Sequence, residues 1–371
     1  MSEHEMLLIP GPVTVEEDVL AAFSQPIRPH YGADWAELYR RVTARLVELF
    51  RTEGDVLLLF GPGMAAVEMA VRSALAPGDH VLVPTNGMFG DRMVQVARAA
   101  GLEVRVLRPP TAQPVDPQAI EEALEADPTI RAVGIVHHET IIGLLNPVRE
   151  ICAMAKAHGA LTIVDAVSSL GGVDLRVDEW RIDLCASVSN KCLGAPVGVA
   201  PLAVSRMAWE AVDDGRPKAA GWYLNLETWR RYEEEWGAWH PHPTTMPTSA
   251  IQALGVAVDR ILAMGLETFQ EHQATAARHV RTALREMGFE MLIPDEIASP
   301  VTTAVLARPG MDVVHYTDWL RTRRRLRIAG GIGDLAGKIF RVGHMGKAAD
   351  SAVVDDYLEA TAEYLTEAGL S

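Results

Sequence analysis

Short apolar runs alternate with amphipathic segments through the first two thirds of this 371-residue chain. The segments between the runs, such as 64–75, 117–126 and 148–158, have helical periodicity and the length that crossover connections need. This alternation predicts an α/β fold with a mostly parallel seven-stranded sheet, whose ligands bind beyond the carboxyl ends of the strands. Seven runs have the length and composition of buried strands: 56–60, 81–84, 103–107, 132–138, 161–167, 184–189 and 197–204.

The pattern changes after a proline-rich stretch at 241–247. Two long periodic segments, 249–264 and 266–287, precede apolar runs at 289–292 and 302–306 and a last periodic segment at 348–368. These features predict a smaller α+β domain at the carboxyl terminus. We therefore divide the chain into an N-terminal segment (1–14), a large domain (15–250) and a small domain (251–371).

The composition is that of an ordinary soluble globular protein, with 49% hydrophobic and 22% charged residues. The formal net charge of −15 argues against nucleic acid or an anionic membrane as a partner. The first residues are acidic and no apolar run approaches the ~18 residues of a membrane span, so we expect a cytoplasmic protein. Three cysteines without CxxC spacing (Cys152, Cys185 and Cys192) are expected to be reduced.

Asp165 and Lys191 both follow strand-length runs. A parallel sheet brings such residues together at its carboxyl edge. Pyridoxal phosphate requires this combination, because a carboxylate keeps the pyridine nitrogen of the cofactor protonated and an amine forms a Schiff base with the cofactor's carbonyl group. The pair therefore predicts a pyridoxal-phosphate site.

A glycine-bearing turn, residues 61–66, joins the first strand to a helix. Such a turn can present backbone N–H groups to a phosphate, and it also fits the permissive dinucleotide pattern GxGxxA. An NAD-dependent oxidoreductase is therefore an alternative, although run 81–84 ends without the acidic residue that a ribose needs. A tight turn without a ligand is the third interpretation.

Phe89 lies in the segment Gly87-Met88-Phe89-Gly90, after the next strand, and is placed to stack on a flat cofactor.

Two adjacent histidines and a glutamate, His137, His138 and Glu139, precede Thr140. Adjacent residues of a strand point to opposite faces, so the histidines cannot readily share a metal ion, and we predict no metal site. Thr140 is better placed as a hydroxyl donor to a cofactor oxygen.

Taken together, these residues resemble those of fold-type I pyridoxal-phosphate enzymes of the class V aminotransferase family, over essentially the whole chain. The resemblance rests on five segments, which are Pro10-Gly11-Pro12, Phe89-Gly90-Asp91-Arg92, residues 164–169, Asn190-Lys191-Cys192-Leu193-Gly194-Ala195-Pro196 and residues 330–346.

The resemblance implies a role for each cofactor-binding residue. Lys191 would form the Schiff base and Asp165 would pair with the pyridine nitrogen. The remaining contacts would be Phe89 and Val167 on the two ring faces, Thr140 on the ring hydroxyl, and Gly63, Met64, Ser189 and Asn190 around the phosphate.

The resemblance also implies a homodimer with shared active sites, because His242 and Thr245 would reach the phosphate from a second subunit. Arg341 would bind the substrate carboxylate through its guanidinium fork. Gly11 and Tyr31 would line the substrate side.

Two branches of the family compete. Residues 137–140, 190–194 and 297–305 resemble pyridoxamine–pyruvate transaminases, whereas 330–346 resembles alanine– and serine–glyoxylate aminotransferases. The chain departs from the first branch at Pro62 and Ile332, where a glutamate and an arginine are expected, and from the second at Ile141 and Ile142, where Ser-Thr is usual. We therefore expect an aminotransferase that moves an amino group from a small amine or amino acid to pyruvate or glyoxylate, with a rather apolar donor pocket.

Overall fold

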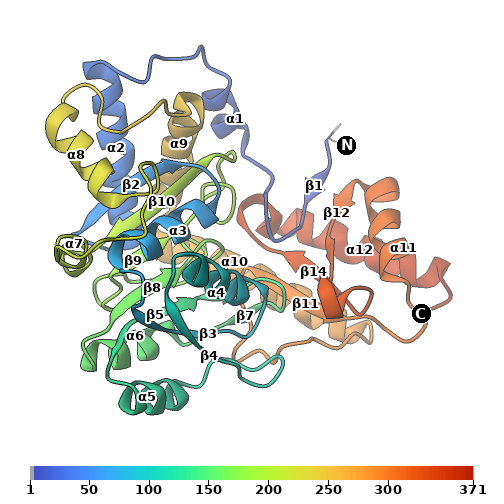
Figure 1. The fold of residues 1–371 in the computed structure, drawn as a ribbon. Helices are drawn as coiled ribbons and strands as arrows, with labels where there is room; N and C mark the ends of the chain where they lie inside the picture. Colours follow the sequence, from blue (N-terminus) through green and yellow to red (C-terminus); the bar gives the residue numbers. More distant parts are fainter. Residues whose placement is uncertain (1–3, 371) are drawn as a thin grey trace.

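The computed structural model describes residues 4–370, which form two packed units (Figure 1). The larger unit surrounds a seven-stranded sheet, and the smaller unit surrounds a three-stranded sheet. Each unit has its own cluster of buried apolar side chains. The α/β class and the seven-stranded sheet predicted from the sequence are confirmed.

The large sheet has the strand order β2-β10-β9-β8-β5-β3-β4. All neighbours are parallel except β10, which runs antiparallel to both β2 and β9. Because β8 and β9 are adjacent and parallel, the segments that follow them begin at the same edge. The strands are β2 (Asp55–Phe60), β3 (His80–Pro84), β4 (Glu103–Leu107), β5 (Ile130–Val136), β8 (Leu161–Asp165), β9 (Leu184–Ala186) and β10 (Val199–Val204).

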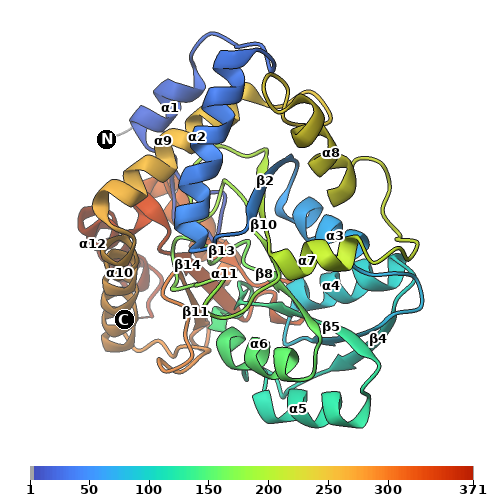
Figure 2. The ribbon, with the colours of Figure 1, turned by 90° about the vertical axis from the view of Figure 1, so that its left-hand side faces the viewer.

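Helices cover both faces of this sheet, with α3 and α4 on one face and α2 and α6 on the other (Figure 2). Their apolar stripes are buried against the strands, which is what the helical periodicity of the sequence predicts. The helices of the larger unit are α1 (Glu17–Phe23), α2 (Ala33–Phe50), α3 (Gly63–Ala74), α4 (Met88–Ala99), α5 (Pro117–Ala126), α6 (Val148–Ala157), α7 (Arg206–Val212), α8 (Leu226–Trp236) and α9 (Thr248–Met264).

Gly265 separates α9 from the next helix, α10 (Leu266–Glu286), and its φ of +87° suits a glycine. The residue range 4–370 contains no single helix long and apolar enough to cross a bilayer, and α9 and α10 meet that test only as a pair bent by 88°. Helix α9 packs against α1 and α2 in the larger unit. The predicted domain boundary between residues 250 and 251 therefore falls inside α9.

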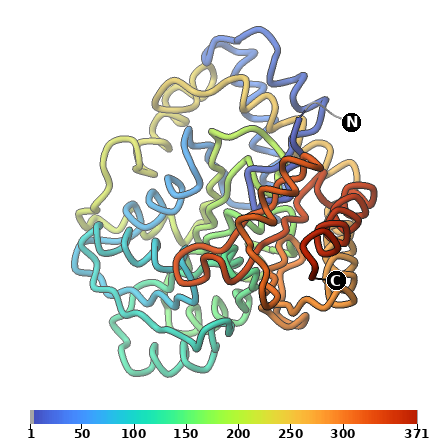
Figure 3. Tube along the Cα trace, turned by 90° about the vertical axis from the view of Figure 1, so that its right-hand side faces the viewer, coloured from blue at the N-terminus to red at the C-terminus, as the bar shows by residue number. Residues whose placement is uncertain are grey.

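The smaller unit contains the sheet β11-β14-β13. The smaller unit also includes the N-terminal strand β1 (Figure 3). This strand pairs with β12, and Leu8, which follows it, is buried in the apolar cluster of the smaller unit. Its elements are β1 (Met6–Leu7), β11 (Thr302–Leu306), α11 (Val313–Trp319), the π-turn η1 (Leu320–Arg324), β12 (Leu326–Arg327), β13 (Ala329–Gly330), the 3₁₀ turns η2 (Gly333–Leu335) and η3 (Gly346–Ala349), β14 (Ile339–Gly343) and α12 (Ser351–Glu367).

The prediction of a strand at 289–292 is wrong. Only Met291 makes a bridge, to Val305, and no continuous ladder forms. The chain turns at Gly288, where φ is +82°, and again around Pro294, so the run is too short to pair along its length.

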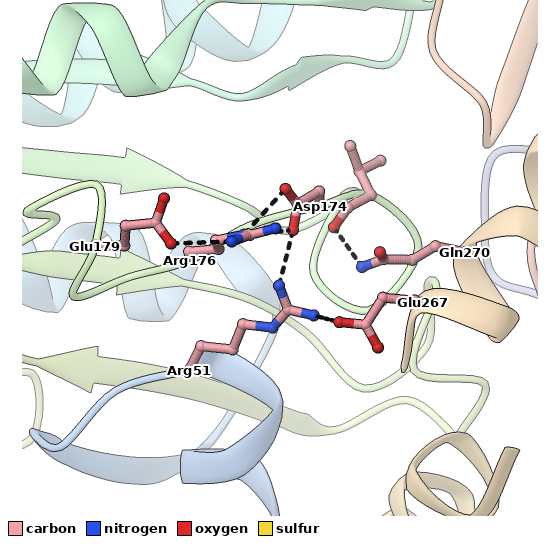
Figure 4. Close-up of polar contacts among 7 residues, drawn as sticks. Arg51, Asp174, Arg176, Glu179, Glu267 and Gln270 are labelled. Atoms are coloured by element: carbon pink, nitrogen blue, oxygen red, sulfur yellow. Dashed lines mark hydrogen bonds and ion pairs between the residues drawn. The ribbon is translucent and has the colours of Figure 1, made fainter. Parts of the chain in front are cut away.

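A polar network joins α2, the loop after β8 and the start of α10 (Figure 4). Arg51, at the carboxyl end of α2, donates to Asp174 (3.0 Å) and forms an ion pair with Glu267. Gln270 of α10 donates to the backbone oxygen of Val173 (3.0 Å). These contacts fix the loop that leaves the Asp165 strand against the first turn of the smaller unit.

Candidate active site

Asp165 is the last residue of β8, and it is buried. The backbone N–H of Val167 donates to its Oδ1 (2.9 Å), and burial raises the pKa of Asp165 to about 6. A carboxylate that is buried without a cationic partner is stabilised when a protonated ring nitrogen binds to it. This environment fits the role that the sequence assigns to Asp165.

Lys191 lies in the turn after β9 rather than at the end of the strand, because β9 stops at Ala186. Its Nζ donates to the backbone oxygen of Pro10. Burial lowers the pKa of Lys191, the Arg341 charge lowers it further, and Asp165 acts in the opposite direction. Lys191 therefore lies within electrostatic range of both Asp165 and Arg341, and the lowered pKa favours a nucleophilic amine.

Gly11 packs directly against this lysine. A Cβ atom at Gly11 would lie 2.3 Å from Cδ of Lys191, and the φ of Gly11 is +91°. Both features require glycine, so the N-terminal segment shapes the position of the lysine side chain.

Arg341 lies in the middle of β14, and it is 6% exposed. Its Nε and Nη2 donate to the backbone oxygen of Gly330, at 3.1 and 2.9 Å. No carboxylate of residues 4–370 forms an ion pair with it. Burial lowers the pKa of Arg341, and the charge of Glu139 opposes this effect. A buried guanidinium of this kind is suited to an anionic ligand.

The predicted phosphate turn begins helix α3 at Gly63. No side chain caps this helix, so the backbone N–H groups of Gly63 and Met64 are donors without an intrahelical acceptor. A Cβ atom at Gly63 would lie 2.5 Å from Cγ2 of Val167, which places the turn against the residue predicted to cover one ring face. Phe89, predicted to cover the other face, is half-buried in the first turn of α4.

Three further predicted cofactor contacts are buried or partly buried at the same sheet edge. Thr140 shares a hydrogen bond with the hydroxyl of Ser168 (Oγ–Oγ 2.7 Å). The Ser189 hydroxyl donates to the backbone oxygen of Pro196 (2.6 Å), and the Asn190 backbone oxygen accepts from Val13 (3.3 Å). Ser168 was not predicted as a site residue.

His242, Thr245 and Tyr31 lie apart from the lysine within this chain. Trp35 donates to Nε2 of His242 (2.8 Å) and Nδ1 contacts the backbone oxygen of Thr244 (2.7 Å), so both ring nitrogens have partners. Burial lowers the pKa of His242 to about 3. Thr245 and Tyr31 are exposed. Throughout residues 4–370, none of the three has a hydrogen bond, ion pair or ring contact with Lys191 or Asp165. The assignment of His242 and Thr245 to a second subunit, and of Tyr31 to the substrate side, stays a prediction.

Sequence reasoning did not assign a role to Glu139, which is 0% exposed. The backbone N–H groups of Phe89 and Ile141 donate to its two oxygens, at 3.1 and 3.4 Å. Burial raises the pKa of Glu139 to about 7, and the charge of Asp165 raises it as well. The only sign of this position in the sequence was an acidic residue directly after the two histidines that end an apolar run.

Comparisons with known proteins agree with this geometry. Residues 28–318 match the family described as aminotransferase class-V. An uncharacterized aminotransferase from Methanocaldococcus jannaschii is 36% identical over 350 residues, covering 94% of this chain and 90% of the relative. A pyridoxamine–pyruvate transaminase from Mesorhizobium japonicum is 32% identical over 363 residues, covering 98% and 92%. The crystal structure of an alanine–glyoxylate aminotransferase from Nostoc sp. superposes with a TM-score of 0.93 at 29% identity, covering 98% and 96%.

The fold is therefore that of a fold-type I transferase. The chain belongs to the class-V aminotransferase family. This membership disfavours the NAD-dependent oxidoreductase, whose only support was the turn at residues 61–66.

Proposed function

We propose that this protein binds pyridoxal phosphate and transfers an amino group from a small amine or amino acid to pyruvate or glyoxylate. One observation carries the proposal: the lysine amine lies within electrostatic range of a buried aspartate and of a buried arginine that has no carboxylate partner among residues 4–370. When bound, the cofactor supplies an electron sink for carbanion chemistry.

The residues around the lysine fit this cofactor. Asp165 would hold the ring nitrogen protonated, and the uncapped start of α3 would bind the phosphate. Phe89 and Val167 would enclose the ring and exclude water. Lys191, with a lowered pKa, would carry the proton between substrate carbon and cofactor.

Arg341 would bind the carboxylate of pyruvate or glyoxylate. Its Nε and Nη2 already donate to the backbone oxygen of Gly330, which fixes the orientation of the guanidinium and leaves the N–H groups of Nη1 and the second N–H of Nη2 to the ligand. The names of the relatives from Mesorhizobium japonicum and Nostoc sp. include pyruvate and glyoxylate as partners of an amino donor, which supports this acceptor class.

A homodimer with shared active sites is part of the proposal. Large apolar side chains are exposed on two neighbouring segments, with Ile27 87%, Tyr31 52%, Trp222 53% and Trp239 46% exposed. The segments touch, because the Gly32 N–H donates to the backbone oxygen of Trp239 (2.8 Å). An exposed apolar surface of this kind is typical of a subunit interface, and it adjoins His242 and Thr245. We also propose a cytoplasmic location, which the three buried free cysteines support.

The test is an absorbance scan of the purified protein followed by a screen of donors. A visible band that bleaches when an amino donor is added, and returns with pyruvate or glyoxylate, supports the transaminase. The donors should include pyridoxamine, because pyridoxamine–pyruvate transaminase is the alternative within the family. A protein without the band, or with a band that no amine bleaches, would contradict the proposal.

A further inference from the structure

Glu139 lies between the parts of the site that hold the cofactor and the part that binds the substrate. It is on β6 (His138–Glu139), which forms a hairpin with β7 (Leu144–Leu145) at the carboxyl edge of the large sheet. A Cβ atom at Gly87 would lie 2.4 Å from Cδ of Glu139, so the loop before α4 closes directly over the carboxyl group. The position is sealed from solvent.

Both carboxyl oxygens are held by backbone N–H groups, those of Phe89 and Ile141. No lysine, arginine or histidine of residues 4–370 forms an ion pair with Glu139. A buried carboxylate without a cation is costly in its charged form. Because a carboxylic acid can still accept both N–H bonds, a proton can be gained without displacing Phe89.

Charged groups of two elements interact with Glu139. Asp165 of β8 is an anion and Arg341 of β14 is a cation, and each affects or feels the charge of Glu139. On α4, Asp91 is engaged with Thr85 and Arg108, and Arg92 lies over the Phe89 ring at 5.1 Å. The hairpin of Glu139 also packs beside Arg341, because a Cβ atom at Gly143, in the turn of the hairpin, would lie 3.3 Å from the backbone nitrogen of Ala304, and Ala304 pairs with Arg341 in the small sheet. Arg341 is thus the nearby cation on which the charge of Glu139 acts.

We propose that Glu139 is the anion that faces Arg341 while the acceptor site is empty, and that it takes up a proton from solvent when a substrate carboxylate binds to Arg341. This inference rests on the proposed function, since it needs a carboxylate at Arg341.

The reason is charge balance in a buried cleft. An incoming carboxylate adds a third anion beside Asp165 and Glu139, while Arg341 can neutralise only one of them. Asp165 is committed to the ring nitrogen, so it stays ionised. Glu139 is the remaining acid, and protonation removes its repulsion with the ligand.

The experiment uses the cofactor-loaded full chain and propanoate, a monocarboxylate that cannot react. Calorimetric titrations at pH 7 in two buffers of different ionisation enthalpy give the number of protons taken up. We expect about half a proton per site in the wild type, because Glu139 is partly ionised at pH 7. Glu139→Gln should bind propanoate with no uptake, and Arg341→Met should lose binding.

Glu121→Gln is the control for an acid-to-amide change, because this side chain is exposed on α5, outside the site. It should keep the wild-type uptake. A second measurement needs no variant. In the wild type at pH 5, Glu139 should already be protonated, so the number of protons taken up on propanoate binding should fall toward zero.

Undiminished uptake in Glu139→Gln, or no uptake in the wild type at pH 7, would overturn the inference while leaving the aminotransferase intact. Failure of the proposed function is separate, because it would appear in the same samples as a missing visible band or as propanoate binding that Arg341→Met does not change.

Discussion

Replacement of Glu139 by glutamine should change how the stability of the cofactor-free chain depends on pH. Burial raises the pKa of this carboxyl from 4.5 to about 7 in the folded chain. An acid whose pKa is raised by folding contributes stability in full below pH 4.5, and this contribution is lost as the pH rises through 7. A glutamine does not titrate, so the variant keeps the same contribution at every pH.

The expected magnitude follows from the rise in pKa. A rise from 4.5 to about 7 corresponds to roughly 3 kcal/mol in the free energy of unfolding, of which about 2.5 kcal/mol falls between pH 5 and pH 8. Glutamine has one oxygen for the two N–H donors of Phe89 and Ile141, which costs about 1 kcal/mol at any pH. The two chains should therefore be about equally stable at pH 5, and the variant should be the more stable chain by roughly 2 kcal/mol at pH 8.

Urea unfolding of both chains at pH 5 and pH 8, at one protein concentration, measures this difference. Buried histidines such as His138, whose pKa burial lowers to about 3, titrate in both chains and cancel in the comparison. Glu121→Gln on the exposed face of α5 is the control for an acid-to-amide change. A difference between wild type and Glu139→Gln that is the same at both pH values would refute the reasoning.

Three further predictions concern the proposed catalytic groups. Lys191→Ala should abolish the visible band of the bound cofactor while the unfolding midpoint stays close to that of the wild type, and a persistent band would contradict the assignment. Asp165→Asn should retain the cofactor but lower kcat by roughly 10²–10³-fold, because an amide cannot hold the ring nitrogen protonated; near-normal turnover would leave Asp165 a packed strand-end residue. Arg341→Lys should weaken pyruvate binding in single-turnover experiments by about tenfold or more, since one charge-assisted hydrogen bond of the fork is lost; a carboxylate-free amine in the other half-reaction should be affected far less.

The sequence predicts the elements of the larger unit well because their periodicity is a local property. The seven strands and helices such as α5, which starts with Pro117 after the capping residue Asp116, are all visible in the amino-acid pattern. The direction of β10 could not be predicted from the amino-acid pattern. An antiparallel strand between β2 and β9 is buried on both faces, so it has the same apolar composition as a parallel strand.

From the residue pattern alone, the sequence predicts proximity only for Asp165 and Lys191, whereas the other site residues, Arg341 among them, were predicted from the family resemblance. Asp165 and Lys191 follow adjacent strands, so strand ends suffice to bring them together. Glu139 and Arg341 come from strands in different units, and nothing local to either predicts that the charge of Glu139 acts on Arg341. The His242 assignment stays a prediction, and within this chain Nε2 of His242 already accepts a hydrogen bond from Trp35.

The buried arginines restrict the substrate further. Residues 4–370 contain two arginines below 9% exposure, Arg281 and Arg341, and Arg281 is paired with Asp295 at 2.9 Å. Ile332, where a second arginine was expected, cannot bind an anion, and Ile141 adds apolar surface beside Glu139. A ligand with one carboxylate can satisfy Arg341, whereas a dicarboxylate would bring an anion without a partner into a cleft that already holds Asp165 and Glu139. We therefore expect 2-oxoglutarate to be a far poorer acceptor than pyruvate in kcat/KM, and equal use of the two would show that a second cation, supplied from elsewhere in the assembly, lines the site.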